Sequence, residues 1–303
     1  MALHKDNRHV PVLLDEVLTG IDIRSGQTVV DGTLGNAGHA EAIAKRIGKP
    51  GTLIGIDADP LAIHESRLVL ENAAPRVIIE NTNFSNIRAV LQDHNIKQVD
   101  AILLDLGLRR GSLEDTGRGF SFQKLDEPLD MRFNPNDETL TPASVMVNSF
   151  GDHTLADIFY HYADERLSRR YARAIIEARS KELIETVGDL VQIIDDATPT
   201  RARRPGKTSA TKVFQALRMA VNKELEVLET TLLEALEILK TGGRLAVISF
   251  HSIEDRLVKR TFKKLATKNL VKLTPKKPIK PTRQEILKNP LSRSATLRII
   301  TKL

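Results

Sequence analysis

Apolar and polar positions follow two different periodicities in the first third of the chain. Short, nearly continuous apolar runs predict strands over residues 27–31, 52–57, 76–80 and 99–104. Amphipathic stretches predict helices over 38–47, 60–72 and 85–94, with Pro60 in a first turn and Ser85 as an N-cap. Apolar strands that alternate with helices in this way are typical of a parallel sheet covered on both faces.

The next apolar strand, predicted over residues 244–250 after the turn Thr241-Gly242-Gly243, stands far along the chain. Asp105 and Arg244 are separated by 138 residues, whereas a strand–helix–strand crossover needs about 30. Helical spacing of apolar residues over 154–197 predicts an all-α insert, which breaker-rich segments bound at residues 113–205. Residues 1–112 and 206–303 then form one discontinuous domain, with a crossover helix expected over 210–239.

The C-terminal part predicts a basic amphipathic helix over 252–266, followed by short strands over 270–273 and 296–302. A terminal hairpin after the fifth parallel strand adds an antiparallel strand, whereas dehydrogenases usually add a parallel one. The predicted fold is therefore a doubly wound, Rossmann-like α/β sheet of the class I methyltransferase type, with an all-α insert.

Candidate binding residues gather at the predicted strand ends, where open α/β sheets bind ligands. A glycine-rich turn over 32–38 follows the first strand, and Asp57 ends the second, 22 residues after Gly35. We expect Asp57 to accept both hydroxyls of an adenosine ribose; the alternative is that it caps the helix at Pro60. The glycine spacing GxxGxxG departs from the nicotinamide fingerprint GxGxxG, which disfavours a nicotinamide-dependent oxidoreductase.

Further candidates carry open alternatives. Asp105, at the end of the fourth strand, is the expected chemical group, or else a hydrogen-bond acceptor for the following loop. Phe84 either stacks on an adenine or is an ordinary buried aromatic. His39 is expected to be a neutral hydrogen-bonding group near a helix start, and His251 either orients a loop or acts on a substrate. No metal site is expected, although Asp31, Asp57 and Asp59 are a minor candidate for Mg²⁺.

The amino-acid composition excludes some kinds of chemistry and indicates the kind of partner. The chain has no cysteine, so a Cys nucleophile and thiolate metal sites are excluded. It has no apolar run of about 20 residues and no apolar signal segment at its polar N-terminus, so we expect a cytoplasmic protein with no membrane partner. The net charge of +6 is concentrated in residues 255–303, which carry 15 Lys and Arg against 2 acidic residues. Such a tract suits a polyphosphate partner, or is a solvated lysine-rich surface.

Several unusual motifs extend over nearly the whole chain. They are residues 9–14, 31–39, 56–60, 102–107, 118–122, 128–132, 213–218, 220–222, 249–256 and 292–295. In these motifs the chain resembles the MraW (RsmH) family of S-adenosylmethionine-dependent methyltransferases. The resemblance implies transfer of a methyl group to the exocyclic N4 of a cytidine in the decoding region of 16S rRNA. The implied partner is thus the small ribosomal subunit; monomer and homodimer stay open.

The resemblance also implies roles for individual residues. Asp105 would be catalytic, and cofactor contacts would fall on Ala37, Gly38, His39, Asp57, Phe84, Asp105 and Ser112. Arg109, Arg110, Ser249 and His251 would contact the substrate, and the helical insert would recognise RNA.

Two departures from the family pattern bear on these roles. Ala37 interrupts a glycine run, which is tolerated if its φ is negative. The sequence Leu108-Arg109-Arg110-Gly111-Ser112 replaces a Ser-Ser-Pro-Gln type segment, whose cofactor-binding glutamine corresponds to Ser112. Arginines that point inward would repel a sulfonium, and arginines that point outward would bind RNA phosphates. The alternative function is a catalytically impaired, RNA-binding ribosome-assembly factor.

Overall fold

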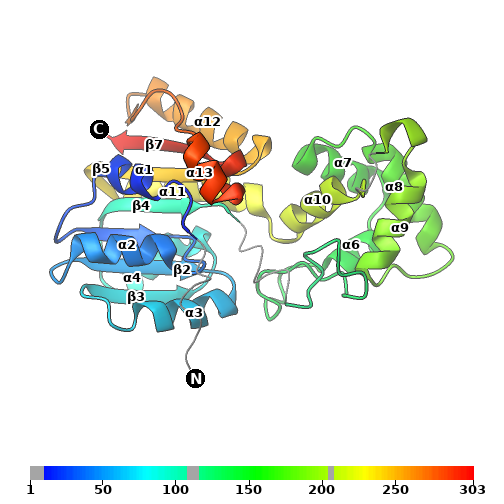
Figure 1. Cartoon of the computed structure of the whole chain (residues 1–303), viewed down its shortest axis with the longest axis horizontal. Helices are drawn as coiled ribbons and strands as arrows, with labels where there is room; N and C mark the ends of the chain where they lie inside the picture. The colour runs from blue at the N-terminus through cyan, green and yellow to red at the C-terminus, as the bar shows by residue number, and fades with distance from the viewer. Residues whose placement is uncertain (1–9, 108–115, 204–207) are drawn as a thin grey trace. The chain divides into compact units, whose positions relative to one another are not determined.

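The computed structural model describes residues 10–107, 116–203 and 208–303, which form two compact units (Figure 1). The first unit runs to Gly107 and resumes over Leu225–Leu303, and the second ends at Glu224. The candidates Arg109, Arg110 and Ser112 lie outside the described residues. In the described ranges, no helix combines the length and the apolar character that a membrane span requires.

A seven-stranded sheet forms the centre of the first unit, in the order β3-β2-β1-β4-β5-β7-β6. The strands are β1 (Thr28–Asp31), β2 (Thr52–Asp57), β3 (Arg76–Asn81), β4 (Val99–Asp105), β5 (Leu239–Ser249), β6 (Val271–Leu273) and β7 (Thr296–Lys302). Strands β1 to β5 pair in parallel, and β7 is antiparallel to both β5 and β6. The predicted fold class, with its antiparallel terminal hairpin, is confirmed.

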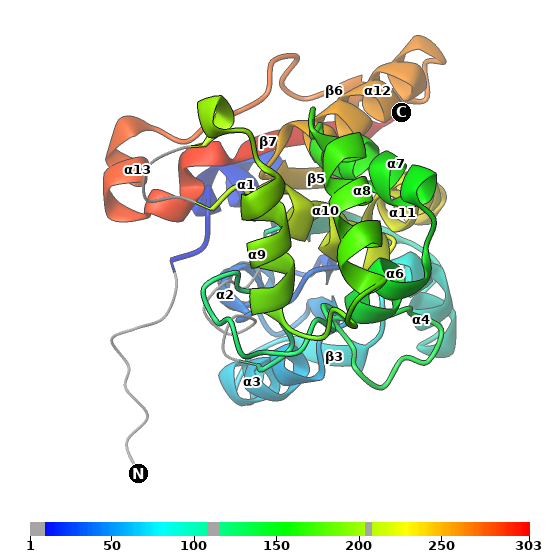
Figure 2. The same ribbon diagram turned by 90° about the vertical axis from the view of Figure 1, so that its right-hand side faces the viewer.

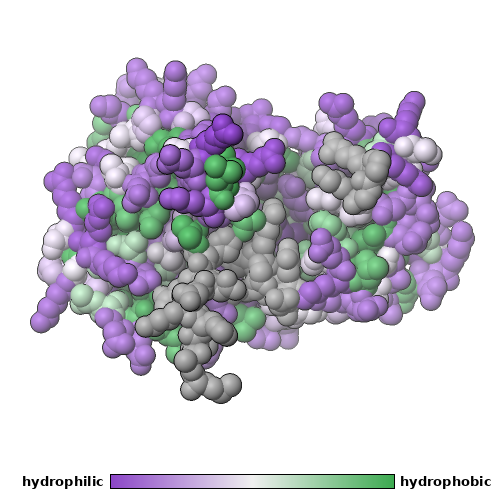
Figure 3. All heavy atoms as spheres, in the orientation of Figure 1, coloured by the Kyte–Doolittle hydropathy of each residue, from purple (hydrophilic) through white to green (hydrophobic). Residues whose placement is uncertain are grey.

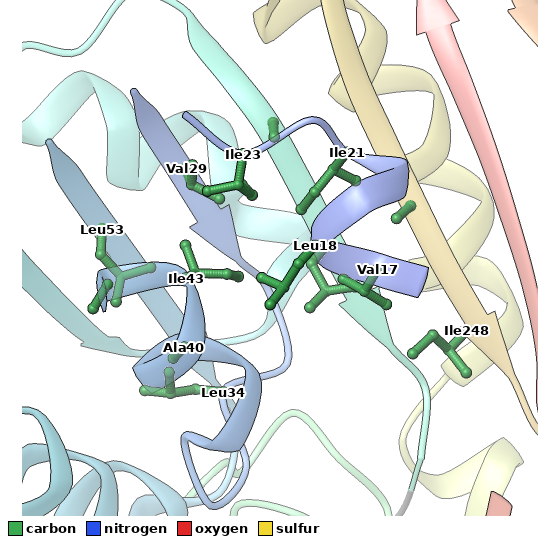
Figure 4. Packing of buried hydrophobic residues seen from close by; sticks show 14 of the residues in the cluster. Val17, Leu18, Ile21, Ile23, Val29, Leu34, Ala40, Ile43, Leu53 and Ile248 are labelled. Carbon is green, nitrogen blue, oxygen red and sulfur yellow. The ribbon is translucent and has the colours of Figure 1, made fainter. Parts of the chain in front are cut away.

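Alternating side chains of the strands supply two cores, one on each face of the sheet. Val29 packs with helices α1 (Leu14–Gly20), α2 (Gly38–Ile47) and α3 (Pro60–Leu70), whereas its neighbour Val30 packs with α4 (Ile87–Asp93), α11 (Glu224–Ile238) and α12 (Ser252–Thr267). Figure 4 shows Leu18 of α1, Ile21 directly after it and Ile43 of α2 against the sheet. This alternation of neighbouring side chains between the two faces gives the sheet a core on each side.

The described part of the second unit consists of a segment without helix over residues 116–142, followed by helices (Figure 2). Its helices are α6 (Ala143–Ser149), α7 (Asp152–Ala163), α8 (Ser168–Arg179), α9 (Val187–Ala197) and α10 (Thr211–Val221). They share a core that includes Phe159, Tyr171, Leu190 and Phe214. Thr186 caps α9 with a capping box, since its side chain accepts from Asp189 N–H and the Asp189 side chain accepts in return.

The division between the two units differs from the predicted boundary at residue 205. Helix α10 packs in the core of the second unit through Val213, Phe214 and Leu217. Of the two helices in the predicted crossover, α11 is the one that packs on the sheet, through Leu228, Leu232 and other apolar residues. The amphipathic pattern of α10 predicts a helix but does not indicate which of the two cores the helix joins.

Local details also correct the sequence predictions. Ser85 is not an N-cap: Asn83 accepts from Ser85 N–H at the short helix Phe84–Asn86, and α4 begins at Ile87. The predicted turn at Thr241–Gly243 is part of β5, which starts at Leu239 and pairs irregularly with β4. Three helices were not predicted, namely α1, α6 and α13 (Arg283–Lys288).

Candidate active site

Three carboxylates stand at the carboxyl ends of neighbouring strands. Asp57 ends β2, Asp31 ends β1 and Asp105 ends β4, and these strands adjoin one another in the sheet. Asp31 pairs with Gly55 of β2 and with Leu103 of β4, so both other carboxylates lie two residues beyond its partners. We call these three side chains the carboxylate rim.

The glycine loop over 32–38 is fitted closely to the strand ends. Gly32 N–H donates to Leu103 O at 2.9 Å, and Leu34 N–H donates to Ile56 O at 2.9 Å. A Cβ at Gly32 would lie 2.6 Å from Leu104 Cδ2, and one at Gly38 would lie 2.6 Å from Pro11 Cγ. The loop therefore tolerates no side chain at these glycines without movement of its neighbours.

Ala37 was expected to be tolerated in the glycine loop if its φ is negative, and the structure contradicts this condition. Its φ is +56°, which is the left-handed region, and it is fully buried as the N-cap of α2. A side chain in this region costs about 1–2 kcal/mol relative to glycine, because Cβ approaches the following carbonyl oxygen. The tight turn into α2 imposes this conformation, since Ala37 N–H donates to Leu34 O at 2.7 Å.

Asp57 accepts a hydrogen bond from the glycine loop and does not cap α3. Its Oδ2 accepts from Gly35 N–H at 2.8 Å, and its Oδ1 accepts from Asp59 N–H at 2.9 Å. Asp59 is the residue that caps α3, because its carboxylate accepts from Leu61 N–H. The capping alternative for Asp57 is thus wrong. A carboxylate offers about four acceptor positions, so the two bonds are compatible with further donors.

Asp105 is connected to both the following loop and α2. Its Oδ1 accepts from Gly107 N–H at 3.1 Å, and its Oδ2 lies 3.6 Å from His39 Nδ1. His39 is buried, and its Nε2 lies 3.0 Å from Val12 O, which can only accept and therefore places a proton on Nε2. The Asp105 side chain keeps 21% of its surface exposed, so a ligand can reach it.

Asp31 is the buried member of the carboxylate rim. It is 1% exposed, and burial raises its pKa well above the usual range of a carboxyl. The hydrogen bond from Thr33 N–H lowers this pKa, while the charges of Asp105 and Asp57 raise it further. Removing like charges from water is unfavourable unless a cation compensates them, so the rim suits a small, positively charged ligand.

Thr33 is a site residue that the sequence reasoning missed. Its Oγ1 accepts from Asp105 N–H at 2.6 Å, while its own N–H donates to Asp31 Oδ1 at 3.2 Å. It thereby ties the ends of β1 and β4 together. The available signal was a hydroxyl between Gly32 and Leu34, inside a loop that otherwise consists of small and apolar residues.

Phe84 and Gly38 border the same loop. Phe84 is half-buried and packs against the core on the α4 face, and its Cβ lies 3.4 Å from a Cβ built on Gly32. Gly38 begins α2, directly after Ala37. Both residues therefore line the turn between the first strand and its helix, as a cofactor contact requires.

Ser249 and His251 lie at the start of α12 and make contacts within the protein. Ser249 is 2% exposed, and its hydroxyl donates to Thr296 O at 3.3 Å. His251 is the N-cap of α12: its Nδ1 accepts from Glu254 N–H at 3.3 Å, and its Nε2 lies 2.8 Å from Glu254 Oε1. These contacts orient the loop after β5 and give no support to a direct substrate contact by either residue.

The described ranges contain no group of three or more His, Cys, Asp or Glu side chains arranged to hold a metal ion. Asp59, the third member of the minor Mg²⁺ candidate, instead caps α3.

Fold and site together define a class of protein. The strand order, the antiparallel β7, the glycine loop after β1 and the acid at the end of β2 are those of a class I methyltransferase. The MraW methylase family matches residues 6–303, and the chain belongs to this family. It is therefore an S-adenosylmethionine-dependent methyltransferase, and a nicotinamide-dependent oxidoreductase does not fit.

Relatives match over nearly their full length. A protein of Acetivibrio thermocellus named Ribosomal RNA small subunit methyltransferase H is 44% identical, covering 98% of this chain and 99% of the relative. A protein of the same name from Dictyoglomus thermophilum is 42% identical over 96% of this chain and 95% of its own length. Another from Ruminiclostridium cellulolyticum is 41% identical, with 98% and 99% covered.

Proposed function

We propose that this chain transfers the methyl group of S-adenosylmethionine to the exocyclic N4 of a cytidine in the decoding region of 16S rRNA. The observation that carries the proposal is the carboxylate rim, with Asp105 exposed beside the glycine loop, in a chain of the MraW methylase family. The names of the relatives support small-subunit ribosomal RNA as the substrate.

The residues of the loop fit the proposed cofactor. Gly38, Ala37 and His39 would contact it where the loop enters α2, and Phe84 would cover the adenine. Asp57 would accept the ribose hydroxyls through its remaining acceptor positions. A sulfonium and an ammonium are cations, and the carboxylates of Asp57 and Asp105 at the rim suit this ligand class. When bound, the cofactor supplies an activated methyl group on a good leaving group.

Asp105 is the proposed catalytic residue. The amine of cytidine is a poor nucleophile, because its lone pair is delocalised into the ring. A carboxylate that accepts a hydrogen bond from the amino group returns electron density to nitrogen and helps to remove a proton after transfer. The Gly107 N–H and His39 next to Asp105 would hold this carboxylate in one orientation. Orientation of the amine toward the methyl group would supply much of the acceleration.

The target base must leave its stack to reach such a pocket, so binding requires contacts to the surrounding RNA. We propose that the helical insert provides some of them. The exposed residues Arg166, Arg169 and Arg173 lie on or just before α8, and the partly engaged Arg170 donates to Ala197 O. Arginine is suited to phosphate because its planar fork forms paired hydrogen bonds.

The predicted substrate roles of Arg109, Arg110, Ser249 and His251, the cofactor role of Ser112 and a cytoplasmic location remain predictions. The relatives are named as methyltransferases, which gives no support to the impaired alternative.

Mass mapping of rRNA from cells that lack this protein tests the proposal. A missing methyl group on a decoding-region cytidine is expected to return with the wild type and not with Asp105→Ala. Asp93→Ala is the matched control, because Asp93 is an exposed carboxylate on α4. An unchanged modification profile in the deletion strain contradicts the proposal. Calorimetry with S-adenosylmethionine then distinguishes an inactive RNA-binding factor from an enzyme with another target.

A further inference from the structure

The exposed ionisable side chains of α12 and its C-cap are all cationic. Lys259, Arg260, Lys263, Lys264 and Lys268 are exposed and recur on successive turns of this helix. We call these five residues the basic face. Figure 3 shows hydrophilic side chains over the part of the sheet unit that carries α12.

The acidic residues of α12 are turned inward. Glu254 is 3% exposed, and its Oε2 accepts from the N–H groups of Phe250 and His251. Asp255 binds Arg298 of β7 through two hydrogen bonds of 2.8 and 3.0 Å. Neither carboxylate therefore neutralises the basic face, whose charge is left for an external partner.

Within the ranges that the structure describes, no residue of the basic face has an ion-pair partner. A purely structural explanation covers part of the pattern, because cations near a helix C-terminus interact favourably with its dipole. That explanation suits Lys264 and Lys268, which stand at the end of α12. It does not explain Lys259 and Arg260, which lie in the middle of the helix.

We propose that the basic face binds the phosphate backbone of the RNA substrate. This inference rests on the proposed function and assigns part of the RNA contact to the sheet unit. Successive helical turns are about 5.4 Å apart, so the face offers cations over about 14 Å from Lys259 to Lys268. The aromatic residue of α12, Phe262, is 1% exposed, so bases have nothing to stack on there. The contact is thus electrostatic and independent of sequence.

A membrane surface is the competing anionic partner, and the packing of α12 disfavours it. A helix that lies in a membrane interface inserts its apolar face among the lipids. The apolar face of α12, with Val258, Phe262 and Leu265, is buried against the sheet. The cations of the basic face remain accessible, which suits a phosphate chain.

The test compares two triple variants with equal loss of charge. One combines Lys259→Gln, Lys263→Gln and Lys264→Gln; the control combines Arg46→Gln, Lys49→Gln and Lys97→Gln, whose side chains are also exposed but belong to other parts of the sheet unit. Binding of a labelled decoding-region RNA fragment is measured between about 50 and 200 mM salt. Three lost phosphate contacts reduce the slope of log K against log salt by about 2, so the variant loses roughly 20-fold less affinity than the wild type over this range.

The control triple is expected to keep the wild-type slope, and both variants to keep the affinity for S-adenosylmethionine. Equal slopes for wild type and the α12 variant overturn the inference. So does an α12 variant that loses binding to phosphatidylserine vesicles while its RNA binding is unchanged. If the wild type binds RNA with the expected slope but methylates none, the proposed function fails and this inference stands.

Discussion

The carboxylate rim and the basic face of α12 belong to the same unit and carry opposite charges. They differ in how far their charged groups are exposed to solvent. In the rim, Asp31 is 1% exposed and the backbone N–H groups of Thr33, Gly35 and Gly107 hold the carboxylates in fixed positions. On α12, exposed lysines project from a helix whose acids are used internally. Partly buried carboxylates in fixed positions are screened less and favour a small cation in one orientation, whereas exposed charges are screened by salt and suit a long, flexible anion.

This comparison implies different responses to salt. We expect the affinity for S-adenosylmethionine to change little between low and moderate ionic strength, because Asp57 and Asp105 are partly buried and are screened less than surface charges. The affinity for RNA is expected to fall steeply over the same range. Variants at the two sites should therefore separate cofactor binding from RNA binding.

The largest expected effect is at Asp105. Asp105→Asn keeps an oxygen that can accept from Gly107 N–H but removes the negative charge. We expect kcat to fall by about 10²–10⁴-fold, the usual range for loss of a proton-accepting group, with RNA affinity unchanged. Single-turnover methyl transfer to the RNA fragment measures this. A variant with normal kcat would remove Asp105 from the chemistry.

The next effect is at Asp57. Asp57→Asn removes the charge from the group that accepts from Gly35 and Asp59 N–H. We expect the Kd for S-adenosylmethionine to rise by about 10- to 100-fold, because hydrogen bonds to charged groups contribute about 1.5–3 kcal/mol. Calorimetry measures the Kd, with Asp93→Ala as control. An unchanged Kd with a reduced kcat would place Asp57 outside the cofactor contact.

A smaller effect concerns the anchoring of α12. Asp255→Ala leaves Arg298, which is 16% exposed, without its paired carboxylate. We expect the free energy of unfolding to fall by about 1.5–3 kcal/mol, measured by urea denaturation. The affinity of the folded variant for RNA should not decrease, because an acid next to the basic face has been removed. Weaker RNA binding by a fully folded variant would conflict with the proposed role of that face.

The smallest effect is the pH dependence from Asp31. Because burial raises its folded pKa above 3.8, the ordinary value for an aspartate, the folded protein binds more protons than the unfolded chain above that pH. Stability contributed by this group is therefore lost as pH rises toward the folded pKa, by at most about 1.4 kcal/mol per pH unit. The urea midpoint of the wild type should fall more steeply with rising pH than that of Asp31→Asn. Parallel profiles would argue against a protonated Asp31.

Much of the sheet unit could be predicted because its signals are local. The bounds of α2, β2 and β7 agree with the apolar patterns that predicted them. The rule that ligands bind at the carboxyl ends of parallel strands then brought Asp57 and Asp105 to one edge. The role of Thr33 could not be predicted in the same way, because its partner Asp105 is 72 residues away.

The sequence by itself determined the alternation of strands and helices, the glycine loop and the acids at the strand ends, since each depends on neighbouring residues. Tertiary structure decided that Asp59 rather than Asp57 caps α3, that Ala37 has a positive φ, and that α10 joins the helical core. It also decided that Asp255 pairs with Arg298, which leaves the cations of α12 exposed. The bond of Asp57 to Gly35, the place of α10 and the pair of Asp255 with Arg298 depend on contacts between distant segments, whose free energies are set by packing and not by local pattern.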